Sequence, residues 1–230
     1  IEKDVVISTW QSIYKMPRKY FEQFGCVIGD EAHMFKAKSL TGIMTKLHQC
    51  KYRFGLTGTL DGSQTHKLVL EGLFGTAEKV VSTKELIDKK TLANLKIKCI
   101  VLKHPTKKER MDYVEEMDYI VSRESRNKFI LDLCKNISGN TLCLFQLVEK
   151  HGKILHDGMK GGENVYFVYG GTDTEQREKI RGLVEGHTKS TTIASYGTFS
   201  TGINIRNINN IVLASPSKSK IRVLQSIGRG

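Results

Sequence analysis

The chain has 230 residues, of which 39% are hydrophobic and 26% are charged, values typical of a globular protein with one large domain or two small ones. It contains no run of ~18 apolar residues that could span a membrane, and its five cysteines show no C-x-x-C spacing, so we expect reduced thiols and no structural metal. The net charge of +12 favours a polyanionic partner, with nucleic acid first and an acidic membrane surface second.

Apolar runs of strand length recur along the chain, separated by polar stretches and stretches of helical length. Strands are expected at Val5–Thr9, Val27–Gly29, Tyr52–Leu56, Ile97–Leu102, Thr141–Phe145, Val165–Tyr169, Thr191–Ala194 and Ile211–Ala214. Helical spacing of apolar residues predicts helices within Glu109–Lys135 and Glu175–Glu185. Such alternation predicts an α/β protein with mainly parallel sheets and helices on both faces.

A polar, charged stretch at Asp88–Leu95 is the expected domain boundary, and we divide the chain into residues 1–92 and 93–230. The first part has few strand-like runs, and Ile1 leads directly into one of them. We therefore expect the first domain to be truncated at its N-terminal side.

The strand expected at Val27–Gly29 is followed at once by two carboxylates, Asp30 and Glu31. In open α/β sheets, ligands bind outside the carboxyl ends of the strands. Asp30 there could hold a Mg²⁺ ion through water, while Glu31 could orient the water that attacks a γ-phosphate. A solvated acidic turn explains the same letters equally well.

Thr57-Gly58-Thr59 follows the next strand in the first half of the chain. The glycine permits a tight turn, and the flanking hydroxyls can bond His33 or the carboxylates of the neighbouring strand end. Alone this pattern is also typical of an ordinary turn. Its place about twenty-five residues after Asp30 makes the functional interpretation stronger.

Two glycine- and hydroxyl-rich turns follow strands in the second half. In the first, Gly171 precedes Thr172 and Asp173, either of which could cap the next helix and leave its amino end for a nucleic-acid phosphate. In the second, Ser195–Ile205 would let the backbone approach phosphates, and Asn204 offers a donor and an acceptor to a ribose. A plain helix cap and a flexible surface loop are the alternatives.

The last residues, Gln225–Gly230, place Arg229 where a permanent positive charge could face a γ-phosphate. In this order the motifs resemble those of superfamily 2 helicases of the DExH type. Gly29–His33 is similar to motif II, Leu56–Thr59 to motif III, Gly197–Asn204 to motif V and Gln225–Gly230 to the start of motif VI; Ser8–Ser12 resembles the motif before motif II that contacts nucleic acid. A narrower resemblance, at Tyr196–Ile203 and Lys218–Ile221, is to phage recombination helicases.

The resemblance implies two RecA-like domains that bind ATP and Mg²⁺ between them and DNA across both. It assigns Asp30 to Mg²⁺ through water, Glu31 to the attacking water, and Gly202, Asn204 and Arg229 to the nucleotide. The other roles it implies are coupling of nucleotide state to the other domain for His33 and Gln225, transmission of closure for Thr57 and Thr59, and contact with the nucleic-acid backbone for Ser8, Thr9, Gly171, Thr172 and Thr198. The implied protein is a cytoplasmic monomer that remodels branched or single-stranded DNA and RNA–DNA hybrids.

The chain has no G-x-x-x-x-G-K-[ST] phosphate loop, and the second arginine that the family places after Arg229 would lie beyond Gly230. We therefore expect residues 1–230 alone to be inactive as an ATPase. Two alternatives remain open: an RNA helicase or duplex-RNA-stimulated ATPase on the same scaffold, and a non-catalytic basic module that binds nucleic acid.

Overall fold

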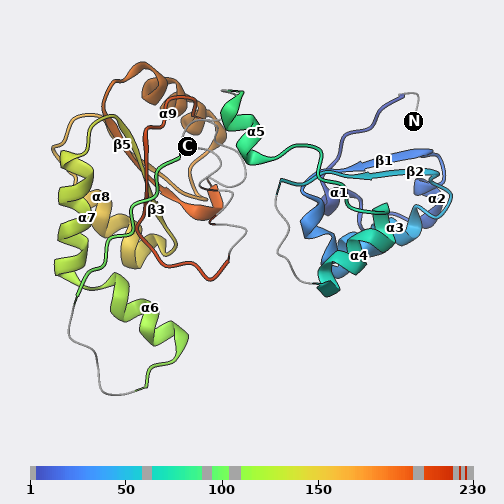
Figure 1. Ribbon diagram of the computed structural model, residues 1–230, viewed down its shortest axis with the longest axis horizontal. Helices are drawn as coiled ribbons and strands as arrows, with labels where there is room; N and C mark the ends of the chain where they lie inside the picture. The colour runs from blue at the N-terminus through green and yellow to red at the C-terminus, as the bar shows by residue number, and fades with distance from the viewer. Residues whose placement is uncertain are drawn as a thin grey trace. The chain divides into compact units, whose positions relative to one another are not determined.

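The computed structural model describes residues 4–58, 64–89, 95–103, 110–198 and 205–219, together with Val223 and Ser226. The chain forms two compact units, Ile1–Thr91 and Leu92–Gly230, and each is described by itself (Figure 1). Within the described residues, no helix has the length and apolar content needed to cross a membrane.

Unit 1 is a two-stranded parallel sheet packed against short helices. Its elements are α1 (Trp10–Ile13), α2 (Arg18–Phe21), β1 (Cys26–Gly29), the 3-10 helix η1 (Ala32–Lys36), α3 (Lys38–Lys46), β2 (Tyr52–Gly55), α4 (Gln64–Phe74) and α5 (Thr83–Asp88). The strands pair in register from Cys26 with Tyr52 to Gly29 with Gly55. α3 buries Leu40, Ile43 and Met44 at helical spacing, and these side chains join Phe21, Phe35 and Leu70 in the core of this unit.

Unit 2 is a parallel sheet with helices on both faces. Its elements are α6 (Tyr113–Val121), α7 (Glu124–Asn136), β3 (Asn140–Phe145), the π-helix η2 (Val148–Gly152), α8 (Lys153–Asp157), β4 (Val165–Val168), α9 (Thr174–Gly186), β5 (Ser190–Ser195) and β6 (Asn210–Leu213), and the strand order is β4-β5-β3-β6. Alternate residues of β3 enter two cores: Leu142 and Leu144 pack with Ile180 and Val184 of α9, whereas Cys143 and Phe145 pack with side chains of α7 and α8. The prediction of a parallel α/β fold is therefore confirmed.

Two expected strands are wrong. Val5–Thr9 and Ile97–Leu102 belong to no strand, and most of their apolar residues are exposed, with Ile7 95% and Val101 82% exposed. Strand-forming residues make a strand only when another strand supplies the hydrogen-bonding partner. Neither run takes part in the strand pairing of the described residues.

The single helix expected within Glu109–Lys135 is two helices, α6 and α7. A capping box between Asp112 and Glu115 starts α6 at Tyr113. The helix ends at Val121, whose carbonyl accepts a hydrogen bond from the Asn127 side chain at 2.8 Å. This side-chain bond from α7 caps the end of α6, which periodicity alone does not reveal.

All five cysteines are free thiols, as the spacing predicts, but their environments differ. Cys50, Cys134 and Cys143 are buried, whereas Cys26 and Cys99 are exposed. Burial raises the pKa of the Cys50 thiol, because the thiolate would lose its hydration.

Candidate functional site

The carboxyl ends of β1 and β2 lie side by side in unit 1 and bring together the residues that follow both strands. Gly29 pairs with Gly55 at the end of the register. The backbone bonding then continues, since the Leu56 N–H donates to the Gly29 carbonyl at 2.9 Å and the Ala32 N–H donates to the Leu56 carbonyl at 2.8 Å. The chain after β1 is thereby held beside Thr57.

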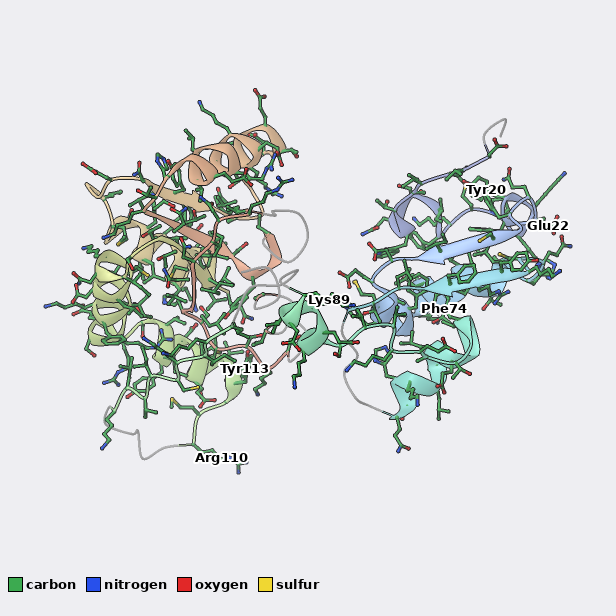
Figure 2. All side chains as sticks on the ribbon, turned by 45° about the horizontal axis from the view of Figure 1, so that its top comes forward. Tyr20, Glu22, Phe74, Lys89, Arg110 and Tyr113 are labelled. Carbon is green, nitrogen blue, oxygen red and sulfur yellow. The ribbon has the colours of Figure 1, made fainter. Side chains whose placement is uncertain are left out.

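Two glycines make room for an aromatic pair beneath these strand ends. A Cβ at Gly29 would lie 2.8 Å from the Phe35 ring, and one at Gly55 would lie 2.9 Å from the Phe74 ring. Phe35 and Phe74 meet edge to face, with centroids 5.1 Å apart, and Figure 2 labels Phe74 at the end of α4. Only glycine leaves space for both rings, so these residues fix the packing under the site.

We expect Gly29→Ala to destabilise unit 1 by about 1–3 kcal/mol, because the added methyl group forces Phe35 or the strand to shift. Gly25→Ala is the matched control, since a Cβ there meets no atom within 4 Å. Urea unfolding followed by the fluorescence of Trp10, the single tryptophan, measures both variants in this unit. Equal stability of the two variants would contradict the packing argument.

Glu31 marks a sharp turn at the end of β1. Its backbone is left-handed, with φ 49° and ψ 47°, a conformation that costs a non-glycine residue about 1–2 kcal/mol. The Glu31 N–H donates to Oδ1 of Asp30 at 2.8 Å, which helps to hold the turn. Strain of this kind collects at functional sites, where it aims a side chain that a regular strand or helix would point elsewhere.

His33 connects the two strand ends. Its ring is buried, and Nδ1 lies 3.0 Å from Oγ1 of Thr57 and 3.2 Å from Oε2 of Glu31. Both contacts use the same ring nitrogen, and the donor in each depends on which ring nitrogen carries the proton. The hydroxyls after β2 were expected to bond either His33 or the carboxylates after β1, and in this structure the Thr57 hydroxyl bonds His33.

Asp30 and Glu31 fit the oxygen chemistry of Mg²⁺. Asp30 is exposed and uses Oδ1 to accept the Glu31 N–H, and the Glu31 side chain is 41% exposed. Among the described residues, no group of three or more His, Cys, Asp and Glu side chains could enclose a metal ion. Magnesium ions bound with nucleotides take only one or two carboxylates and complete their shell with water and phosphates, which is the arrangement these side chains can supply.

The glycine turn after β4 in unit 2 is a helix cap, and Asp173 provides it. The Asp173 carboxylate accepts the Gln176 N–H at 2.7 Å and begins α9. Thr172 is buried, and its Oγ1 accepts the Tyr169 N–H at 3.1 Å. Gly171 is exposed beside the Tyr169 ring, so the backbone of Gly171 is more accessible to a nucleic acid than the Thr172 side chain.

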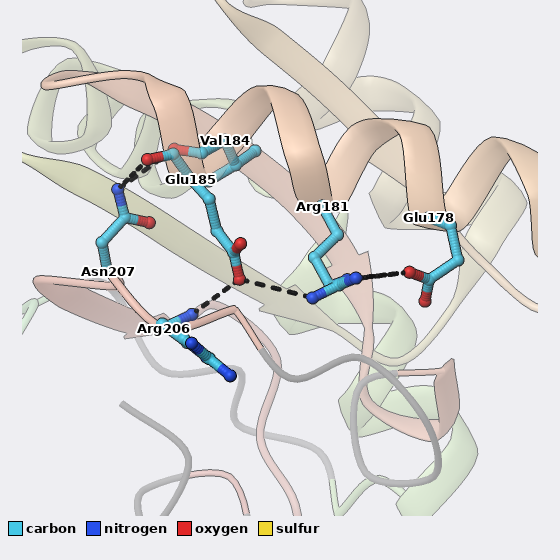
Figure 3. Close-up of polar contacts among 6 residues, drawn as sticks. All are labelled: Glu178, Arg181, Val184, Glu185, Arg206 and Asn207. Carbon is cyan, nitrogen blue, oxygen red and sulfur yellow. Dashed lines mark hydrogen bonds and ion pairs between the residues drawn. The ribbon is translucent and has the colours of Figure 1, made fainter.

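Thr198 is buried just after β5, with Oγ1 2.7 Å from the Ser195 hydroxyl. The chain after this region is anchored on α9 (Figure 3). Asn207 donates from Nδ2 to the carbonyls of Val184 and Glu185 at 3.2 and 3.0 Å, and Glu185 accepts the Arg206 N–H at 3.3 Å. These contacts close the carboxyl end of α9 and fix the chain that leads into β6.

Ser8 and Thr9 are exposed before α1, and the Thr9 hydroxyl lies 2.9 Å from that of Ser12. The structure thus groups Asp30, Glu31, His33 and Thr57 in unit 1 and places the other described candidates at separate strand and helix ends. The remaining predicted site residues lie outside the described part of the chain: Thr59, Gly202, Asn204, Gln225 and Arg229.

A buried polar network in unit 2 was not expected from the sequence. His151 of η2 lies 2.8 Å from the Ser215 hydroxyl through Nδ1 and 3.2 Å from Oδ1 of Asn127 through Nε2. Because Asn127 donates its amide N–H to Val121, its oxygen is the acceptor, so His151 carries its proton on Nε2. Ser215 also accepts the Gln146 N–H at 3.0 Å, which ties together the ends of β3 and β6.

Two protein-family models match the chain. One, described as "Helicase conserved C-terminal domain", matches residues 124–230, and the other, described as "Type III restriction enzyme, res subunit", matches residues 1–62. With the phage relative described next, they support the resemblance of the chain to the superfamily 2 helicases. The resemblance drawn from the motif order is thereby confirmed.

The chain is 38% identical to the ATP-dependent DNA helicase uvsW of Enterobacteria phage T4, over 98% of this chain and 46% of that protein. It is also 22% identical to the probable helicase D10 of Escherichia phage T5, over 100% of this chain and 50% of that protein. The chain therefore spans about half the length of these curated relatives.

Two solved structures are similar to the chain. The crystal structure of T4 UvsW is 34% identical and has a TM-score of 0.47, covering 96% of this chain and 44% of that one. S. cerevisiae Dbp5 bound to RNA and ADP BeF3 is 13% identical and has a TM-score of 0.57, covering 100% of this chain and 56% of that one. The likeness to Dbp5 supports the RecA-like α/β fold.

Proposed function

We propose that the full-length protein is an ATP-dependent DNA helicase or translocase that unwinds or branch-migrates DNA intermediates of recombination and of replication forks, and RNA–DNA hybrids. The observation that carries the proposal is the cluster of Asp30, Glu31, His33 and Thr57 at two neighbouring parallel strand ends. The identity to a phage DNA helicase and the net charge of +12 support DNA as the partner.

In this proposal residues 1–92 and 93–230 belong to two helicase domains. ATP and Mg²⁺ supply the phosphoryl group and the cation that neutralises its charge. Asp30 orders water on the cation, and Glu31 orients the attacking water. His33 Nδ1 contacts both Glu31 and Thr57, so the carboxylate lies next to the chain that follows β2.

The coupling of hydrolysis to movement is also part of the proposal. Binding of ATP closes the two domains, hydrolysis reopens them, and each state grips the strand differently. The residues near the nucleic-acid backbone are Ser8, Thr9, Gly171, Thr172 and Thr198. The first three are exposed, whereas Thr172 and Thr198 are buried. Gly202, Asn204, Gln225 and Arg229 serve the nucleotide, and Thr59 transmits closure together with Thr57.

ATP hydrolysis by the full-length protein tests the proposal, measured without nucleic acid and with single-stranded DNA, a four-way DNA junction or duplex RNA. We expect the junction to stimulate turnover most. Stimulation by RNA alone would move the substrate to RNA while keeping the fold and mechanism. Absence of hydrolysis under every condition would favour a non-catalytic basic module.

Three further properties belong to this proposal. We expect a monomer that acts in the cytoplasm of a phage-infected cell. Residues 1–230 alone are expected to give no measurable hydrolysis, because this stretch lacks the phosphate-loop lysine and glycines. Turnover by this stretch near that of the full-length protein would contradict the last expectation.

A further inference from the structure

The outer edge of β4 offers unpaired backbone groups. β4 is the first strand in the order β4-β5-β3-β6, and no other strand of the described residues pairs with its free side. The Thr191 N–H donates to the Asn164 carbonyl, so in a parallel ladder Tyr166 and Val168 point their backbone groups toward β5. The backbone N–H and C=O groups of the alternate residues, Val165 and Phe167, point to the opposite side of β4, away from β5.

This free edge is short because the chain itself closes it at one end. The Tyr169 N–H donates to Oγ1 of Thr172 at 3.1 Å, and the Tyr169 carbonyl accepts the Thr172 N–H at 3.0 Å. The open stretch therefore spans Val165 to Phe167. An additional strand of roughly four residues would satisfy it, at a rise of about 3.3 Å per residue.

A groove of about 580 Å³ runs along this edge. Its volume lies within the range of sites that hold a ligand. Side chains of α9, α8 and β4 line the groove. They include Gln176, Lys179, Ile180 and Leu183 of α9, His156 of α8, and Val165, Tyr166, Phe167 and Tyr169 in and just after β4. The edge is therefore recessed between side chains of two helices, where a single extended segment fits better than another sheet.

The sequence of β4 itself carries none of the residues that usually discourage pairing. Natural edge strands carry lysine, proline or a bulge, whereas β4 reads Val-Tyr-Phe-Val. Leu183 lines the groove with its side chain 43% exposed. Lys179 is exposed and has no ion pair within the described part of the chain, and no carboxylate lines the groove.

We propose that this groove binds an extended segment of a partner protein, which adds to the sheet as a strand beside β4. An apolar side chain of the segment packs on Ile180 and Leu183, and an acidic side chain pairs with Lys179. The backbone bonds to Val165 and Phe167 supply affinity, and the alternate side-chain contacts supply specificity.

Nucleic acid fits this edge less well than a polypeptide. Val165 and Phe167 present both N–H and C=O groups, and a phosphate backbone only accepts hydrogen bonds. Asp173 and Glu175 line a neighbouring hollow that shares Gln176 and Lys179 with the groove, and these carboxylates repel a phosphate backbone, which carries one charge per nucleotide, more strongly than the single acidic side chain of the proposed segment. A second copy of the chain fits poorly as well, because its own β4 is recessed in the same way.

The test pans a phage-displayed heptapeptide library on the full-length protein and measures the affinity of selected synthetic peptides. We expect peptides with alternating apolar residues and an acidic residue, which bind Leu183→Glu and Lys179→Glu about tenfold or more weakly. Lys128→Glu, the same charge change at an exposed position of α7, is the matched control and keeps full affinity.

Amide hydrogen exchange distinguishes strand addition from a contact of side chains alone, because only strand addition protects alternate backbone amides of β4. Peptide binding should slow exchange at Val165 and Phe167, while Tyr166 and Val168, already bonded to β5, change little. The proposal is overturned if no peptide is enriched over a library panned on Leu183→Glu, or if enriched peptides bind both groove variants with full affinity. The proposal is also overturned if the single-stranded DNA oligonucleotide (dT)12, and not a peptide, slows hydrogen exchange at Val165 and Phe167.

Discussion

Glu31→Gln should lower ATP turnover by the full-length protein roughly 10²–10⁴-fold, the range lost with a general base or a water-orienting carboxylate. Glutamine keeps the length of the side chain but replaces one carboxylate oxygen by an amide nitrogen, which cannot accept a proton. ATP affinity should change little, because Glu31 acts on the attacking water rather than on the bound phosphates. Turnover at saturating ATP and junction DNA, together with equilibrium ATP binding, measures both effects.

The control for this experiment is Glu22→Gln in the same unit. Glu22 is exposed just after α2 (Figure 2), and it takes no part in the contacts described above for Asp30, Glu31, His33 and Thr57. Its substitution should leave both turnover and ATP affinity unchanged. Equal turnover of Glu31→Gln and the control would remove Glu31 from the reaction and leave it as a turn residue.

The site in unit 1 was predictable because parallel strands end at the same edge of a sheet. Two strand-like runs, each followed by polar residues, were enough to predict that a hydroxyl after β2 meets either His33 or the carboxylates after β1; the choice of His33 comes from the structure. The left-handed backbone of Glu31 could not be predicted, because it depends on the bonds that hold Ala32 to Leu56. Local sequence identifies the side chains, whereas the paired strands determine where they point.

The two wrong strands have a related cause. Val5–Thr9 and Ile97–Leu102 have the composition of strands, but pairing is a long-range property that the run itself does not encode. His151 was missed for the opposite reason, because a single histidine in the polar run Glu149–Gly152 carries no pattern. The π-helix turns it inward, where Asn127 and Ser215, distant in the chain, complete its hydrogen bonds.

The buried His151 should make the stability of unit 2 depend on pH between about 6.5 and 4. Burial first, and then the positive charge of Arg126, lower the pKa of His151 from 6.5 to about 4. In this window the unfolded chain binds a proton that the folded chain does not, so the free energy of unfolding falls as the pH falls. The difference of roughly 2.5 pKa units corresponds to a loss of about 3 kcal/mol, complete near pH 4.

His151→Gln isolates this contribution. The glutamine amide can donate to Asn127 and its oxygen can accept from Ser215, so the network keeps its bonds but no longer titrates. Urea unfolding, followed by the methyl NMR signals of Leu142 and Leu144 at pH values from 7.5 to 4, should show a shallower loss in the variant. His48→Gln, at an exposed histidine of unit 1, should keep the steep loss of the unsubstituted protein.

The contribution of the carboxylates to the pH dependence of stability is the same in His151→Gln and in the unsubstituted protein, so it cancels when the two are compared. The two proteins then differ only in the slope of the free energy of unfolding against pH. That slope is set by the difference between the number of protons bound by the unfolded chain and by the folded chain. Parallel curves for His151→Gln and the unsubstituted protein would mean that His151 takes up its proton while unit 2 is folded. In that case the network of Asn127, His151 and Ser215 would tolerate a charge, and the ends of β3 and β6 would not depend on a neutral ring.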